Sequence, residues 1–142
     1  MRSNNRQGGF TLIEIMVVVM VIALMGAIIG PTVFKQLDKA KMTRIAQDIR
    51  VLEGALKFYK MDNYRYPTQA QGLEALITQP VGEEKWAGPY LPILPVDPRG
   101  DSAYGYTNPS THGKDVDVFT LGFDNQTGGE GPDKDWGNWN IK

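Results

Sequence analysis

The sequence has no cysteine and a single histidine among its 142 residues. Without cysteine, neither a disulfide nor a thiolate nucleophile is available, so the folded part needs a sufficient core or another cross-link such as a bound metal. His112 lies in a Ser-Thr-His-Gly segment, which we interpret as an exposed turn. Strong positive charge is also absent: the net charge is -1 and the pI is near 5.8, which argues against nucleic acid as a partner.

The sequence contains a long uncharged segment near its start. No charged residue occurs between Glu14 and Lys35, and the 20 residues 15–34 are mostly Ile, Val, Leu, Met and Ala. As a helix they measure about 30 Å, the thickness of a bilayer's hydrocarbon core. A secretory signal peptide has a shorter apolar core, and a chain of this size cannot bury a helix that is apolar on every side. We therefore predict a membrane-spanning helix, whose orientation the basic residues on both flanks leave open.

Two residues of this segment stand out. Glu14 places a carboxylate at the start of the apolar run, where burial in hydrocarbon costs about 3 kcal/mol or more, so it requires a partner. Pro31 removes a backbone hydrogen bond and clashes with the preceding turn. It predicts a kink or a locally extended segment near residues 26–31.

The chain beyond Pro31 changes character. From Met42 to Tyr59, apolar residues recur at alternating steps of three and four, which predicts an amphipathic helix. Its apolar stripe is expected to pack on a sheet, with an interface to neighbouring subunits as the alternative. Tyr66 precedes a proline, so the helix should end near residues 62–66.

The remainder predicts a small α+β head. A short helix is expected over residues 68–78, with Thr68 as its N-cap. The Gly- and Pro-rich residues 82–99 read as an ordered loop. Strands are expected around residues 103–108 and 117–122, paired as an antiparallel hairpin. Five bulky side chains of the loop are expected to pack on the core: Trp86, Tyr90, Leu91, Ile93 and Leu94.

Acidic residues gather near the C-terminus, where Asp124, Glu130, Asp133 and Asp135 lie within twelve residues. Carboxylates on a glycine-rich loop suit Ca²⁺, which takes six to eight oxygen ligands. The spacing does not match an EF-hand. From spacing alone, a calcium site and an exposed acidic loop both remain open. An acid/base pair of Asp124 and Asp133 is disfavoured, since no pocket is evident around them.

The residues GGFTLIE, from Gly8 to Glu14, follow a short basic leader and resemble the class III signal of type IV pilins and pseudopilins. The resemblance implies that a prepilin peptidase cuts between Gly9 and Phe10 on the cytoplasmic side and methylates the new amino terminus. It also implies that Glu14 meets the Phe10 amine of a neighbouring subunit during filament assembly. Within one subunit the same two residues are four apart, which permits pairing on one helix face.

The same resemblance implies a domain organisation and an orientation. Residues 1–9 are a cleaved leader that stays in the cytoplasm, residues 10–34 span the inner membrane as half of a long spine helix, and residues 35–66 form its amphipathic half. Residues 67–142 form a head in the periplasm. By resemblance, the helix melts between Glu14 and Pro31 inside the filament.

The segment LGFDNQTGGEGPDKDW is similar to the calcium loop of the major pseudopilin family of type II secretion. Asn125 stands where that family has glycine, and asparagine tolerates the left-handed conformation. Carried over by position, the resemblance implies Ca²⁺ ligands from two backbone carbonyls and three carboxylates: Leu121 and Gln126, with Asp124, Asp133 and Asp135.

The resemblance as a whole implies a type IV pilin-like fold and a structural subunit of the periplasmic pseudopilus, which drives export of folded proteins through the outer membrane. The implied partners are further copies of the chain, minor pseudopilins, the prepilin peptidase, the inner-membrane assembly platform and inner-membrane lipid. No nucleophile with a base partner is visible, so an enzyme is not expected. The alternatives are a type IV pilin or competence pseudopilin, or a membrane-anchored calcium-binding module that does not polymerise.

Overall fold

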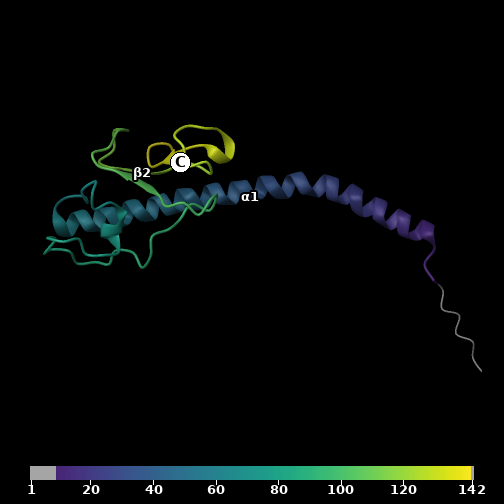
Figure 1. Cartoon of the computed structure of the whole chain (residues 1–142), viewed down its shortest axis with the longest axis horizontal. Helices are drawn as coiled ribbons and strands as arrows, with labels where there is room; N and C mark the ends of the chain where they lie inside the picture. The colour runs from purple at the N-terminus through teal and green to yellow at the C-terminus, as the bar shows by residue number, and fades with distance from the viewer. Residues whose placement is uncertain (1–8, 142) are drawn as a thin grey trace, which may run out of the picture. The chain divides into compact units, whose positions relative to one another are not determined.

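The structure, a computed structural model, describes residues 9–141 and divides into two compact units at Asp38 and Lys39. One long helix, α1, comes first, and short elements follow it (Figure 1). In chain order the elements are α1 (Leu12–Asn63), the 3₁₀ helix η1 (Leu73–Leu76), the strands β1 (Gly105–Thr107) and β2 (Asp117–Thr120), the 3₁₀ helix η2 (Gly131–Asp133) and the strand β3 (Trp136–Gly137).

In the N-terminal unit, α1 leaves its apolar side chains unpacked. Every residue from Leu12 to Ile29 is exposed, and α1 is long and apolar enough to cross a membrane. The helix continues through Pro31, so of the two alternatives predicted near residues 26–31, a kink or a locally extended segment, the extended segment does not form. A proline deletes only one N–H donor, and the uninterrupted hydrogen bonds on either side keep the helix intact.

The C-terminal unit is built on the amphipathic part of α1. The predicted stripe is buried: Ile45, Ile49 and Leu52 have no exposed surface, and the helix ends at Asn63, inside the predicted window. These side chains pack against residues of η1, β1 and β2. Each fully buried aliphatic side chain contributes about 1.5–3 kcal/mol, so this stripe supplies much of the head's stability.

The predicted hairpin forms and gains a third strand. The sheet order is β1-β2-β3, and both strand pairs are antiparallel. Gly105 faces Phe119, and a Cβ atom on Gly105 would lie 2.5 Å from the Phe119 ring, so only glycine fits there. β3 is two residues long and was not predicted, because a strand this short leaves no alternation to read in the sequence.

The short helix expected over residues 68–78 is mostly absent. Gly72 has a φ of 56°, which ends any α-helical path, and only the 3₁₀ turn η1 remains. Thr68 does not cap that turn. Instead its N–H donates to the Gln71 side chain, and its hydroxyl accepts from the Gln71 N–H, in a separate turn before Gly72.

The loop of residues 82–99 is ordered and irregular, as predicted. The Trp86 indole donates to the carbonyl of Ala75 at 2.8 Å, and the ring of Tyr90 meets that of Tyr59 edge-on. Trp86, Tyr90, Leu91 and Leu94 pack against the core. Ile93 does not: 74% of its surface is exposed, because the loop turns it outward.

Candidate functional site

The predicted processing site opens the described part of the chain. Gly9 and Phe10 precede α1 in an irregular, exposed segment, and 85% of the Phe10 surface is exposed. Residues 1–8 of the predicted leader lie outside the described residues. An exposed, non-helical backbone is what a peptidase requires at the bond that it cleaves.

Glu14 already has a partner in the uncleaved chain. Its Oε2 accepts hydrogen bonds from the N–H and the hydroxyl of Thr11, both at 2.8 Å, and the Thr11 hydroxyl accepts from the Glu14 N–H at 3.3 Å. This is a capping box, in which an N-cap Thr and a Glu three residues later satisfy each other's backbone donors. The Thr-x-x-Glu pattern of a capping box is present in the sequence, but this cap was not predicted.

The acidic C-terminal loop runs from Leu121 to Asp135 and closes on itself. The backbone carbonyl of Asp133 sits so near Gly122 that a Cβ atom there would be 2.4 Å from it, and 2.7 Å from it at Gly129. The Phe123 N–H also donates to the carbonyl of Pro132 at 3.2 Å. Two glycines of positive φ therefore let the two arms of the loop meet backbone to backbone.

Three predicted ligand residues lie in the first arm, Leu121, Asp124 and Gln126. The Asp124 carboxylate accepts from the Gln126 N–H at 3.1 Å, which folds the arm into a tight turn. Asn125 has a φ of 54°, as expected for an asparagine in the place of glycine. The turn thus keeps the conformation that the glycine would have given.

The second arm contains Asp133 and Asp135. Asp133 is the last residue of η2, and the Asp135 Oδ2 accepts from the Gly128 N–H at 2.7 Å. The Asp135 Oδ1 is buried without a hydrogen-bond partner in the described part of the chain. Buried carboxylate oxygens without a partner are costly, so this oxygen is suited to receive a cation.

The fit of the loop to a metal is therefore partial. Within residues 9–141, no group of three carboxylate, histidine or cysteine side chains lies close enough to hold an ion. The ligands expected from Leu121 and Gln126 are backbone carbonyl oxygens, a type of donor that calcium accepts. The backbone closes the loop around Asp133, but the carboxylates of Asp124, Asp133 and Asp135 do not come together as a group of three.

His112 is exposed, as predicted, but it does not stand alone. Its ring stacks on that of Trp139 with centroids 3.5 Å apart, and its Nδ1 lies 2.9 Å from the Asp117 Oδ2. Ser110 donates its hydroxyl to Asp117 rather than to the imidazole. The Thr111 hydroxyl lies 3.1 Å from the same Nδ1 that faces Asp117, whereas the nucleophile of a catalytic triad bonds to the other ring nitrogen.

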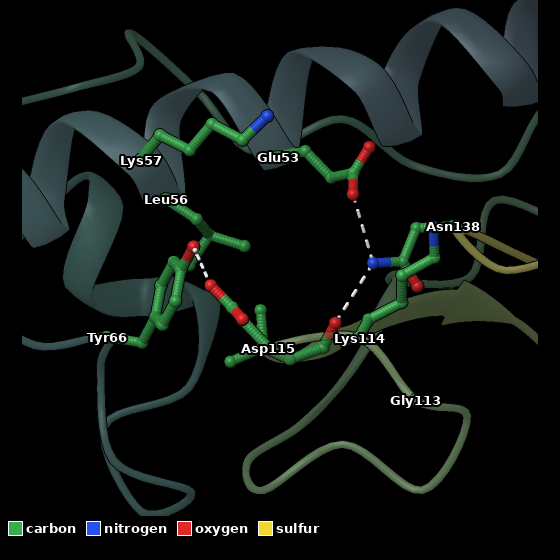
Figure 2. A pocket seen from close by; sticks show the side chains of 9 residues that line it. Glu53, Leu56, Lys57, Tyr66, Gly113, Lys114, Asp115 and Asn138 are labelled. Atoms are coloured by element: carbon green, nitrogen blue, oxygen red, sulfur yellow. Dashed lines mark hydrogen bonds between the residues drawn. The ribbon is translucent and has the colours of Figure 1, made fainter.

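A polar pocket of about 390 Å³ lies beside α1 (Figure 2). Asn138 spans one side, donating to Glu53 at 3.1 Å and to the carbonyl of Val116 at 2.9 Å. Tyr66 has the only hydroxyl of the lining, and it donates to Asp115 at 3.0 Å. Burial, followed by the Asp115 carboxylate, raises the pKa of Tyr66, so this hydroxyl is a poor nucleophile.

Two known family models match this chain, one at its N-terminus and one over the rest. Residues 4–30 match the family model of the prokaryotic N-terminal methylation motif. Together with the exposed apolar segment of α1, the match places the chain in the class of pilin-like proteins that carry an N-terminal methylation motif on a long apolar helix. Residues 32–139 match the model for type II secretion system protein G. The chain belongs to this family, the major pseudopilins of type II secretion.

Relatives and a solved structure agree with that assignment. The chain is 45% identical over 145 residues to the type II secretion system core protein G of Vibrio cholerae, covering 100% of this chain and 98% of the relative. It is 45% identical over 138 residues to the protein of the same name from Pseudomonas aeruginosa, covering 94% and 96%. The crystal structure of the major pseudopilin from enterohaemorrhagic Escherichia coli is similar at a TM-score of 0.63 and 34% identity, covering 76% of this chain and 94% of that chain.

Proposed function

We propose that this chain is the repeating subunit of the periplasmic pseudopilus, the filament that drives export of folded proteins through the outer membrane. The observation that supports this most is the exposed apolar surface of α1 from Leu12 to Ile29. An apolar surface of this extent requires a cover. Lipid covers it while the subunit waits in the membrane, and the helices of neighbouring subunits cover it in the filament.

Before assembly, the subunit crosses the inner membrane once, with the leader in the cytoplasm and the head in the periplasm. The 20 uncharged residues 15–34 suit a single crossing. The prepilin peptidase, the assembly platform and the minor pseudopilins are its further partners. The head contributes structure rather than catalysis, because neither the His112 group nor the pocket beside α1 has an activated nucleophile.

Cleavage changes the partner that Glu14 prefers. In the uncleaved chain, Thr11 satisfies the carboxylate with two neutral donors. Cleavage between Gly9 and Phe10 creates an ammonium group, a partner of opposite charge that the neutral donors of Thr11 cannot replace, and opposite charges attract strongly where the dielectric constant is low. Glu14 therefore exchanges part of its capping box for the Phe10 amine of a neighbouring subunit. Pro31 lacks an N–H donor, which makes the helix between Glu14 and Pro31 easier to melt in the filament.

The test is assembly with the secretion machinery co-expressed. We expect wild-type filaments that can be sheared from the cells, and none from Glu14→Leu, although that variant still inserts in the membrane. Asp38→Asn is the matched control, since it removes another carboxylate of α1 and should assemble. Normal filaments from Glu14→Leu would remove the pairing from the account. An uncleaved wild-type monomer would favour the anchored module that does not polymerise.

The C-terminal loop is the second part of the proposal. We assign a Ca²⁺ ion to it, held by oxygen atoms of Leu121, Asp124, Gln126, Asp133 and Asp135. When bound, the ion offsets the repulsion between the carboxylates and cross-links the two arms, in a chain that has no cysteine for a disulfide. The unpartnered Asp135 Oδ1 and the backbone closure around Asp133 support the assignment. Because the ion binds the folded loop and not the unfolded chain, its binding stabilises the head.

Thermal unfolding with and without a chelator tests the ion. We expect EDTA to lower the melting temperature, and added Ca²⁺ rather than Mg²⁺ to restore it. Asp135→Asn should show no response to either addition. Glu130→Gln is the matched control, because it removes an acidic residue of the same loop that is not assigned to the ion. An unchanged melting temperature of the wild type in EDTA would reject a structural ion.

A further inference from the structure

Arg99 lies outside the acidic loop but contacts it. Its side chain is buried, with 5% exposed, and the carboxylate of Asp97 beside it is fully buried. The Arg99 Nη2 donates to the Asp97 Oδ2 at 2.7 Å, and its Nε lies 3.1 Å from both carboxylate oxygens. A bidentate pair of this kind fixes the plane of the guanidinium.

The other edge of the guanidinium faces the loop. The Arg99 Nη1 donates to the carbonyl of Pro132 at 2.9 Å and to that of Lys134 at 2.7 Å. These two carbonyls flank Asp133 on both sides, and Lys134 directly precedes Asp135. One side chain therefore holds the backbone of the arm that carries two of the assigned ligands.

Asp97 is itself anchored to the sheet. The Thr120 hydroxyl, at the end of β2, donates to the Asp97 Oδ2, and the Asp97 N–H donates to the carbonyl of Ser102 at 2.9 Å. Val96 and Ala103 close the segment with an isolated β-bridge. The guanidinium is thus fixed to the core by Asp97, and the loop is fixed to the guanidinium.

We propose that Arg99 is a positioning residue of the C-terminal loop, which holds the arm of residues 132–135 in place before any ion binds. Its effect on calcium affinity rests on the proposed calcium site, whereas its effect on the order of the ion-free loop does not. Lysine cannot replace it, because an ammonium group lacks the planar fork that reaches a carboxylate and two carbonyls together.

Hydrogen exchange of the full chain in detergent micelles, measured in EDTA, tests the effect of Arg99 on the order of the ion-free loop. The reporter amides are those of Phe123, Asp133 and Lys134, whose hydrogen bonds lie in the loop. We expect Arg99→Lys to speed their exchange at least tenfold, because hydrogen bonds to a charged group are lost. Arg65→Lys is the matched control: it changes the ion pair with Glu83, which lies away from the loop, and should leave these amides unchanged.

Calorimetric titration with Ca²⁺ tests the effect of Arg99 on calcium affinity. We expect the affinity of Arg99→Lys to fall about tenfold, as when groups that orient a ligand are lost, and that of Arg65→Lys to stay the same. If Arg99→Lys does not fold, the double variant Asp97→Asn with Arg99→Gln removes both charges together, so that no buried charge is left unpaired. It should show the same faster exchange.

The outcomes separate the two claims. Unchanged exchange of the reporter amides in Arg99→Lys, or in the double variant, would overturn the positioning role. Faster exchange confined to the loop supports it, whether or not Ca²⁺ binds. A wild-type chain that binds no Ca²⁺ in the titration would overturn the proposed ion and the effect of Arg99 on affinity, while the exchange result in EDTA still decides the role of Arg99 in the loop.

Discussion

At the scale of single residues, Asp117 shows how the head tolerates a buried carboxylate. It is 1% exposed, and it accepts hydrogen bonds from Ser110, Thr111 and His112. Burial acts to raise the pKa of Asp117, but the hydrogen bonds outweigh it and lower the pKa to about 2. The charged carboxylate therefore holds together the turn between β1 and β2 and, through His112, the stacked Trp139.

The sign of the pH dependence follows from that lowered pKa. A carboxyl whose pKa is lower in the folded than in the unfolded chain stabilises the fold above the unfolded value of 3.8, and this stabilisation is lost as pH falls toward about 2. We expect the free energy of unfolding to decrease between these two pH values, and Asp117→Asn to show a smaller decrease. Denaturant titrations at several pH values measure both. Equal slopes for the two proteins would contradict the assignment.

Thr11 allows a second test at this scale. Its hydroxyl and N–H form the capping box with Glu14. Thr11→Val keeps the shape but loses the hydroxyl, so the first turn of α1 should be destabilised by about 1 kcal/mol, the usual worth of an N-cap. Amide exchange at Glu14 and Ile15 in micelles measures it, and Thr11→Ser should behave like the wild type. Identical exchange in Thr11→Val and Thr11→Ser would show that the cap contributes nothing.

At the scale of elements, the amphipathic part of α1 determines the stability of the head. Ile49 is fully buried, whereas 51% of the surface of its near neighbour Val51 is exposed. Ile49→Ala should lower the free energy of unfolding by about 2–5 kcal/mol, through lost burial and the cavity left behind. Val51→Ala, the matched control, should change it by less than about 0.5 kcal/mol. Similar losses in both variants would contradict the packing described here.

Features that depend on local sequence pattern were predicted correctly. Periodicity predicted the buried stripe that ends at Tyr59 and the pairing of β1 with β2, and Pro67 predicted the end of α1. All three predictions are confirmed. The helix over residues 68–78 was wrong, because Gly72 adopts a positive φ that the apolar pattern does not reveal.

Long-range contacts explain the rest of what was missed. Arg99 meets the carbonyl of Pro132 across 33 positions of sequence, and nothing local to either residue indicates the other. In the same way, Trp139 reaches His112 only through the fold. The acidic loop was found from its composition, but the backbone contacts that close it around Asp133 could not be, since they depend on which carbonyls face Gly122 and Gly129.

At the scale of the whole molecule, the two compact units differ in what they expose and what they bury. The N-terminal unit exposes an apolar helix that suits lipid and then other copies of the chain, and the C-terminal unit folds around its own core. The proposed function connects the two units through one reaction: removal of the leader turns the amide nitrogen of Phe10 into an ammonium group, which gives Glu14 a charged partner outside its own chain. Family membership is consistent with this sequence of processing and assembly, since the chain matches both the methylation motif and protein G of type II secretion.

Intact mass spectrometry of subunits taken from sheared filaments tests this account most directly. We expect a single species that begins at Phe10 and carries a methyl group on its amino terminus. Filaments of native appearance whose subunits still begin at Met1 would contradict it, because Glu14 would then have assembled without any ammonium group at Phe10.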